Sequence, residues 1–217
     1  MHIQGDRRMS KSYSIHHTVE AHPDTSLPDP HQDTYVRTTL GFWMYLMTDC
    51  LIFASLFVTY AILHHETFGG PTSRDLFSLK TAFIETMILL VSSVTCGFAI
   101  LASLKKNKNK VIGWLIASFI MGALFVGLEI DEFATFAREG HDWTKSAFLS
   151  GFFSLVGTHG LHVSIGLFWM IVMMAQLHWK GITVTTFRRL VIFGMFWHFL
   201  DLVWIFIFTF VYLMGVI

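Results

Sequence analysis

Long apolar stretches alternate with short polar stretches along most of the chain. Five of the apolar stretches reach the roughly 20 residues that an α-helix needs to cross a hydrocarbon layer about 30 Å thick. We expect these stretches to form transmembrane helices over residues 38–63, 79–104, 110–136, 146–178 and 187–215. The fourth is long enough to tilt in the membrane or to extend past its surface.

The segments between the predicted helices are short and polar. They contain a Gly-Gly-Pro turn at residues 69–71, the hexamer KKNKNK at 105–110, REGHDWTK at 138–145 and WKGITVTT at 179–186. Connections this short make consecutive helices antiparallel neighbours. Residues 37–217 are therefore predicted to form one all-α domain, a polytopic bundle of five transmembrane helices, with no room for a soluble domain.

The first 36 residues differ from the rest of the chain. They contain Pro23, Pro28, Pro30 and five histidines, but no apolar run of even seven residues. This composition is typical of a mobile polar tail and excludes a cleavable signal peptide at the start. We interpret the histidines of this segment as solvated side chains rather than as a metal site.

Composition and charge agree with a membrane protein. The chain is 53% hydrophobic and 14% charged, against roughly 25% charged residues in a soluble domain. Lys plus Arg and Asp plus Glu each number 15, so no charge excess indicates a nucleic-acid partner. Cys50 and Cys96 lie in separate apolar runs, and neither a disulfide framework nor a thiolate metal site is indicated.

The distribution of basic residues predicts the orientation in the membrane. Five spans place the N-terminus on the same side as the 105–110 and 179–186 connections. That side carries eleven Lys and Arg residues, whereas the opposite side carries four. The positive-inside rule therefore predicts a cytoplasmic N-terminus and a C-terminus outside.

Ionisable side chains inside the predicted spans indicate either function or specific pairing, because each is costly at membrane depth unless it is paired or faces a cavity. They are Asp49, Glu85, Glu129, Glu132, His159, His162, His198 and Asp201. Residues three apart share a helix face, and the last four of these residues fall near one mid-membrane depth. We predict a polar layer there, in which a histidine N–H satisfies the Asp201 carboxylate.

Metal or haem ligation, proton transfer and hydrogen bonding are the three roles that compete for these side chains. A dihaem anchor needs two pairs of axial histidines, one pair toward each membrane face. The three deep histidines here, His159, His162 and His198, lie at one depth. Other redox centres need more histidines or clustered cysteines. We therefore predict no catalytic, cofactor-binding or metal-ligating residue in this chain. For Asp49, two roles stay open: a structural hydrogen bond to Tyr45 or to a neighbouring helix, and a proton-linked or lipid-linked role. Glu129 and Glu132 are interpreted as structural or solvated.

A face of small residues lies at the start of the fourth predicted helix. Ser150, Ser154 and Thr158 repeat every four residues, and Gly157 and Gly160 lie three apart. Small residues let a second helix approach closely. This face is expected to pack within the bundle or to dock a partner subunit.

Four blocks of sequence carry a resemblance to a known family. They are GFWMYLMTDCLIF at 41–53, GLEIDEF at 127–133, GTHGLHVSIGLFW at 157–169 and FWHFLDLVWIFIFTFVYLMG at 196–215. Together they resemble subunit III of the haem-copper respiratory oxidases over residues 38–217. The five-helix form, with Asp49 where seven-helix members usually carry Glu, is most similar to subunit III of the cytochrome o ubiquinol oxidases.

The resemblance implies a non-catalytic, multi-pass subunit of a terminal quinol oxidase in the bacterial inner membrane. Such a subunit packs on the haem-bearing subunit I beside subunits II and IV, holds phospholipid and helps to keep proton uptake stable. Haem, copper and the redox chemistry would belong to partner subunits, mainly subunit I. For the residues, it implies lipid binding near a proposed oxygen path at Asp49. It implies structural hydrogen bonding for His159, His162, Trp197, His198, Asp201 and Trp204.

Other classes of protein remain open at this level. Subunit III of a bacterial cytochrome c oxidase and the related accessory protein of nitric oxide reductase differ only weakly in sequence from a quinol oxidase subunit. A haem b membrane anchor of a dehydrogenase or reductase can also have five spans. A small proton-coupled transporter would show a weak inverted repeat between its halves, and the sequence shows none.

Overall fold

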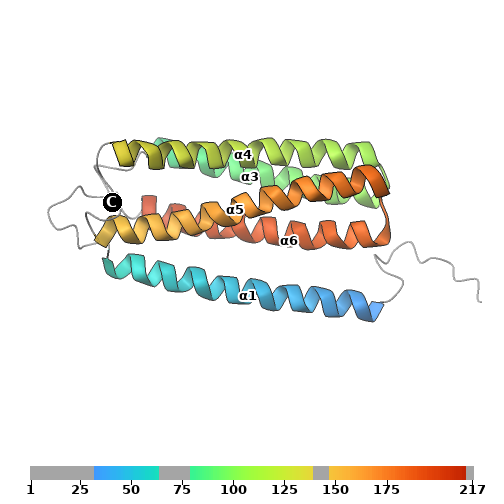
Figure 1. The fold of residues 1–217 in the computed structure, drawn as a ribbon, viewed down its shortest axis with the longest axis horizontal. Helices are drawn as coiled ribbons and strands as arrows, with labels where there is room; N and C mark the ends of the chain where they lie inside the picture. The colour runs from blue at the N-terminus through green and yellow to red at the C-terminus, as the bar shows by residue number, and fades with distance from the viewer. Residues whose placement is uncertain (1–31, 64–78, 139–146, 214–217) are drawn as a thin grey trace, which may run out of the picture.

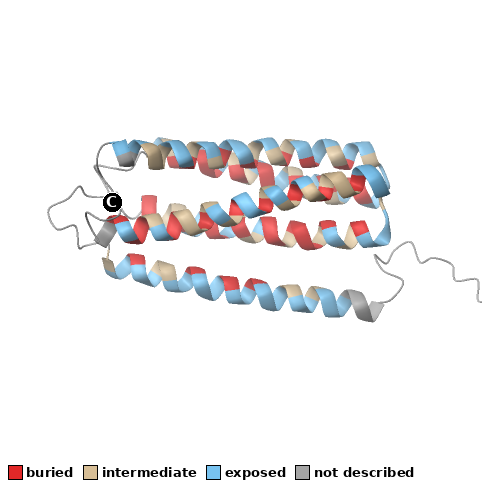
Figure 2. Ribbon diagram, viewed as in Figure 1, coloured by how far each residue is buried: buried red, intermediate tan, exposed pale blue. Residues whose placement is uncertain are grey.

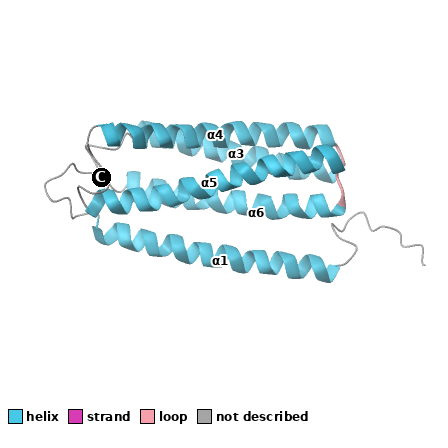
Figure 3. Cartoon of the chain, in the orientation of Figure 1, coloured by secondary structure: helices cyan, strands magenta, loops and turns pink. Residues whose placement is uncertain are grey.

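A computed structural model of the chain describes residues 32–63, 79–138 and 147–213. Apart from two short turns, the described residues are helical and form an elongated bundle (Figures 1 and 3). The elements are α1 (Gln32–Leu63), α3 (Leu79–Leu104), α4 (Lys108–Arg138), α5 (Ala147–Lys180), α6 (Val184–Ile207) and a π-helical turn, η1 (Phe208–Leu213). Each of the five α-helices carries a span long and apolar enough to cross a membrane. The predicted all-α, five-helix architecture is confirmed.

The helix bounds differ from the predicted bounds mainly at the N-terminus. Helix α3 occupies the predicted residues, and α4, α5 and the α6–η1 unit begin and end within three residues of the predicted positions. Helix α1 begins at Gln32, so residues 32–36, which we assigned to the polar tail, are helical. The rest of that tail, residues 1–31, lies outside the described residues, as does most of the charged connection at 138–145.

The turn between α5 and α6 shows why the chain reverses there. Gly181 adopts a positive φ of 69°, and its N–H donates to the Leu177 carbonyl at 3.1 Å, which closes the end of α5. Thr183 then caps α6, because its side chain accepts a hydrogen bond from the Thr186 N–H. Gly181 thus ends α5, and Thr183 starts α6.

Four helices form a ring, and the fifth lies outside it. The contacting pairs α3–α4, α4–α5, α5–α6 and α3–α6 close the ring. Helix α1 packs on α5 and to a smaller degree on α6, and Figure 1 shows it set apart along one side of the bundle. Buried residues line the interior of the ring, whereas most of α1 is exposed (Figure 2).

A tryptophan fills the centre of the ring where two other helices carry glycine. The Trp197 ring lies so close to α4 and α5 that a Cβ added at Gly122 or Gly166 would come within 2.9 Å of it. Its Nε1 donates to the Ser92 Oγ of α3 at 3.1 Å. Trp197 of α6 therefore contacts the three other helices of the ring.

A second tryptophan, about two turns further along α6, also donates a hydrogen bond to α3. Trp204 is fully buried, and its Nε1 donates to the Thr86 Oγ1 of α3 at 3.1 Å. A buried indole N–H needs such an acceptor. Small hydroxyl residues on α3 supply it in both cases, and they tie α6 to α3.

Candidate functional site

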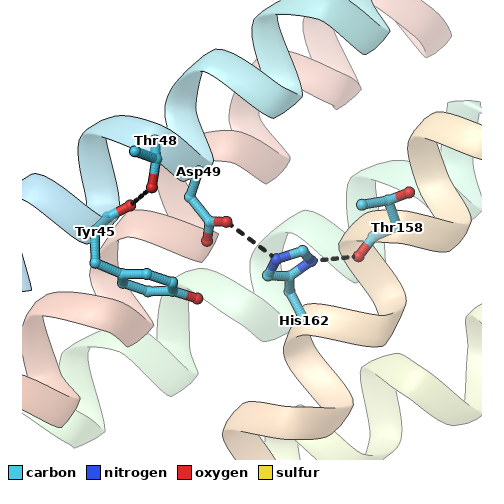
Figure 4. A network of polar contacts seen from close by, with 5 residues as sticks. All are labelled: Tyr45, Thr48, Asp49, Thr158 and His162. Atoms are coloured by element: carbon cyan, nitrogen blue, oxygen red, sulfur yellow. Dashed lines mark hydrogen bonds and ion pairs between the residues drawn. The ribbon is translucent and has the colours of Figure 1, made fainter.

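The first buried polar group lies between α1 and α5. Asp49 Oδ1 is 3.4 Å from His162 Nε2, and the other ring nitrogen, Nδ1, lies 2.7 Å from the Thr158 carbonyl oxygen. Tyr45, one turn before Asp49, directs its phenol toward the same carboxyl group (Figure 4). The structure thus pairs Asp49 with a histidine on another helix as well as placing it beside Tyr45.

The hydrogen bond to Thr158 determines what the other ring nitrogen of His162 offers to Asp49. A carbonyl oxygen only accepts, so His162 Nδ1 must carry the hydrogen that is donated to Thr158. In a neutral imidazole, Nε2 is then an acceptor, and it faces a carboxylate oxygen, which is also an acceptor. A hydrogen-bond donor at position 49 would therefore suit this ring nitrogen better than a carboxylate oxygen does.

This pairing makes two substitutions of Asp49 differ. Asp49→Asn should leave stability close to wild type, because the amide N–H of asparagine can donate to Nε2. Asp49→Ala should lower the free energy of unfolding by about 1–3 kcal/mol, because it leaves the half-buried Nε2 without a partner. Thermal denaturation of the purified protein would measure both effects. Equal destabilisation by the two variants would contradict a hydrogen bond between residue 49 and His162 Nε2.

His159 lies on the same face of α5 as His162 but in different surroundings. It is 0% exposed, stacks on Trp204 with ring centroids 5.2 Å apart and meets the edge of Phe125 at 5.9 Å. Neither of its ring nitrogens has a hydrogen-bond partner among the described residues. His159 thus packs as an aromatic ring and does not join the predicted hydrogen-bonded layer.

The remaining members of the predicted polar layer lie between α3 and α6. His198 Nδ1 is 2.6 Å from the Ser93 hydroxyl, and that hydroxyl also interacts with the Asp201 carboxyl group. Asp201 Oδ1 has no hydrogen-bond partner among the described residues. Ser93 therefore links His198 to Asp201, in place of the direct histidine–Asp201 bond that we predicted.

A cluster of three carboxyl groups lies nearer one end of the ring. Glu85 of α3 meets Glu129 and Glu132 of α4, with one carboxyl oxygen of each residue within 4.8 Å of the others. The hydroxyl of Tyr212, in η1, donates to Glu132 Oε2 at 3.1 Å. Glu129 is buried, so the solvated interpretation of this residue is wrong.

Several residues of these groups were not predicted. Sequence spacing finds pairs on one helix, but Ser93, Tyr212 and the link from Glu85 to Glu129 depend on contacts between helices. A signal was present in the adjacent Ser92 and Ser93 of an otherwise apolar stretch, since small hydroxyl residues commonly bond across membrane helices. Among the described residues, no group of three ionisable side chains placed to share a metal ion includes a histidine.

The five apolar helices, with their polar groups turned toward one another, define a multi-pass membrane protein. Comparison of the sequence with protein families resolves the class further. The chain belongs to the family of cytochrome c oxidase subunit III, whose model matches residues 25–216. The family that we predicted from the four sequence blocks is confirmed.

Curated relatives match nearly the whole chain. Cytochrome bo(3) ubiquinol oxidase subunit 3 of Pseudomonas aeruginosa is 50% identical over 207 residues, which cover 95% of this chain and 99% of the relative. The protein of the same name from Pseudomonas putida is 52% identical over 185 residues, 85% of this chain and 89% of the relative. Cytochrome c oxidase subunit 3 of Bacillus sp. (strain PS3) is 43% identical over 178 residues, 82% of this chain and 86% of the relative.

Proposed function

We propose that this chain is subunit III of a terminal ubiquinol oxidase in an aerobic respiratory chain. The observation that carries the proposal is the nearly full-length similarity to Pseudomonas proteins named as ubiquinol oxidase subunits. The similarity covers all five helices, so the chain and these relatives share a whole subunit rather than one motif. Membership in an oxidase family makes the chain part of an oxidoreductase complex.

Within that complex the chain acts as a non-catalytic subunit. The three histidines deep in its spans have separate partners: His162 pairs with Asp49, His159 packs on Trp204, and His198 bonds to Ser93. The haems of a dihaem membrane anchor need paired axial histidines, and this arrangement offers no such pair among the described residues. Haem and copper would lie in the partner subunit I, which would carry out oxygen reduction and proton pumping.

The partners are oxidase subunits I, II and IV and membrane phospholipid. A shallow groove on the outer side of α5 supports this proposal. It is lined by four residues of the predicted small-residue face, Ser150, Ser154, Gly157 and Thr158, and by the apolar side chains of Phe153 and Leu161. Such a surface fits a transmembrane helix or a lipid chain. Thr158 also binds His162, so an occupant of the groove would lie beside the Asp49–His162 pair.

The orientation follows from the basic residues, which favour a cytoplasmic N-terminus and an external C-terminus in the bacterial inner membrane. The connection between α3 and α4 and the connection between α5 and α6 lie at the end of the bundle where α1 begins (Figure 1). Lys108 Nζ in that region donates to the His178 carbonyl at 2.7 Å. Basic side chains thus gather at the end that we assign to the cytoplasm.

A second candidate is subunit III of a cytochrome c oxidase. The relative from Bacillus sp. (strain PS3) carries that name and matches most of the chain. The number of helices and the buried polar groups do not depend on the electron donor. They therefore do not discriminate between a quinol oxidase subunit and a cytochrome c oxidase subunit. Purification of the complex through an affinity tag on this chain would decide, because the co-purified subunits and the reductant that supports oxygen uptake identify the donor.

We expect the purified complex to contain haem and to consume oxygen with ubiquinol. Oxygen uptake with reduced cytochrome c alone would support the second candidate. After dissociation, this chain should show no reduced-haem absorption band. A stoichiometric haem band in the separated chain would contradict both proposals and indicate a haem b anchor.

A further inference from the structure

Three glutamates meet in the interior toward the end of the bundle where α3 begins and α4 ends. One carboxyl oxygen from each of Glu85, Glu129 and Glu132 lies within 4.8 Å of the others. Glu85 is 0% exposed and Glu129 is 4% exposed. All four carboxyl oxygens of these two residues lack a hydrogen-bond partner among the described residues. Two buried polar side chains thus point into one cluster without hydrogen-bond partners among the described residues.

Among the described residues, the charged groups that act on Glu129 are themselves acidic: the carboxyl groups of Glu85 and Glu132. A further ionisable neighbour is Tyr212, whose hydroxyl donates to Glu132 Oε2 at 3.1 Å. Three carboxylates at this separation, two of them buried, would repel one another strongly and lose much of their hydration. The three groups cannot all be ionised in this arrangement.

We propose that Glu85, Glu129 and Glu132 form a proton-binding site that holds two protons among its three carboxyl groups. The ionised member is Glu132, because it accepts the hydrogen bond from Tyr212 and is the most exposed of the three. Glu85 and Glu129 are then carboxylic acids. Each acid gains an O–H donor that a side-chain rotation brings to a neighbouring carboxyl oxygen, so the unpartnered oxygens acquire partners.

Protons fit this cluster better than a metal ion does. Calcium takes about six to eight oxygen ligands, which commonly include carbonyl oxygens and water, and magnesium keeps several water molecules. The surrounding backbone is helical, so its carbonyl oxygens are bonded within the helices. Glu85 has no exposed surface that could admit water. Protons need neither additional ligands nor additional volume.

The position of Glu132 gives the site a route for exchange. It is partly exposed and lies two turns before the end of α4 at Arg138. A proton from the aqueous phase at this end of the bundle reaches Glu132 first and passes to Glu129, one turn away on the same helix face. The subunit thus carries a proton reservoir, which goes beyond its proposed role as an accessory subunit that packs and holds lipid.

Infrared spectroscopy of the purified complex, containing the full chain, tests the proposal. The wild-type complex near neutral pH should show carbonyl-stretching bands of protonated carboxylic acids that shift in heavy water. Glu85→Gln and Glu129→Gln should each remove the band of one carboxylic acid. The matched control is Asp131→Asn, an exposed carboxyl on the same helix, which should leave these bands unchanged.

Assembly of the variants is itself part of the test. Glutamine matches the shape and neutrality of a carboxylic acid, so both glutamine variants should assemble at the wild-type yield. Failure of both to assemble, or assembled variants with unchanged acid bands, would overturn the proposal. A stoichiometric divalent cation in the wild-type complex that resists a chelator and is lost in Glu129→Gln would also overturn it, because the cluster would then be a metal site.

Discussion

Replacing Trp197 with alanine should lower the free energy of unfolding of this subunit by about 3–5 kcal/mol, the usual cost of truncating a buried aromatic side chain. Trp197 is 2% exposed and stacks on Phe193 with ring centroids 5.8 Å apart. Alanine would leave a cavity beside Gly122 and Gly166, and neither glycine has a side chain that could fill it. It would also remove the donor to Ser92. Denaturation of the purified complex by heat or by detergent, followed by the loss of this chain, measures the change.

Trp179 provides the matched control for this substitution. It lies at the end of α5 and is 81% exposed. Trp179→Ala removes the same number of atoms without opening an interior cavity, so the stability should change little. If the two tryptophan variants unfolded at the same denaturant concentration, the packing of the ring around Trp197 would not be what stabilises the bundle.

Replacing Gly166 with valine should destabilise the bundle by about 1–3 kcal/mol through overpacking. A Cβ at this position would lie 2.9 Å from Trp197 Cζ3 and 3.2 Å from Phe196 Cε1. Both neighbours are atoms of rigid rings that are themselves buried, so relief requires α5 and α6 to move apart. The expected result is a lower melting temperature and easier dissociation of the complex.

Gly160→Val on the same helix isolates the steric effect. A Cβ there would have no atom within 4 Å beyond its own helix, while the intrinsic cost of valine in a helix is the same at both positions. The Gly160 variant should therefore resemble wild type. Comparable losses in the two variants would mean that the helix itself, and not its contact with Trp197, is sensitive to valine.

The bounds of the helices could be predicted because a membrane span needs a fixed length of apolar residues. The depth of a residue could be predicted for the same reason, since each residue advances by a constant rise along the helix. Lateral neighbours could not be predicted in this way. His162 and Asp201 lie at similar depths by counting, yet His162 faces Asp49 of α1 and Asp201 faces Ser93 of α3.

The acidic cluster of Glu85, Glu129 and Glu132 could likewise be predicted only in part. Glu129 and Glu132 were expected on one face because three residues separate them on a helix, and the structure brings both to Glu85. Their burial could not be predicted, because their place near a helix end is equally compatible with solvent. It depends on how α3 and η1 pack around them, which no pattern on α4 alone specifies.

The position of α1 outside the ring bears on how the subunit is made. Helix α1 is synthesised before the other four described helices, but its main partner, α5, is translated only after α3 and α4. Until then, Asp49 lies in the membrane without His162. The four later helices can close their ring without α1, because none of the ring contacts includes it. Helix α1 therefore docks late, and the order of assembly differs from the order of translation.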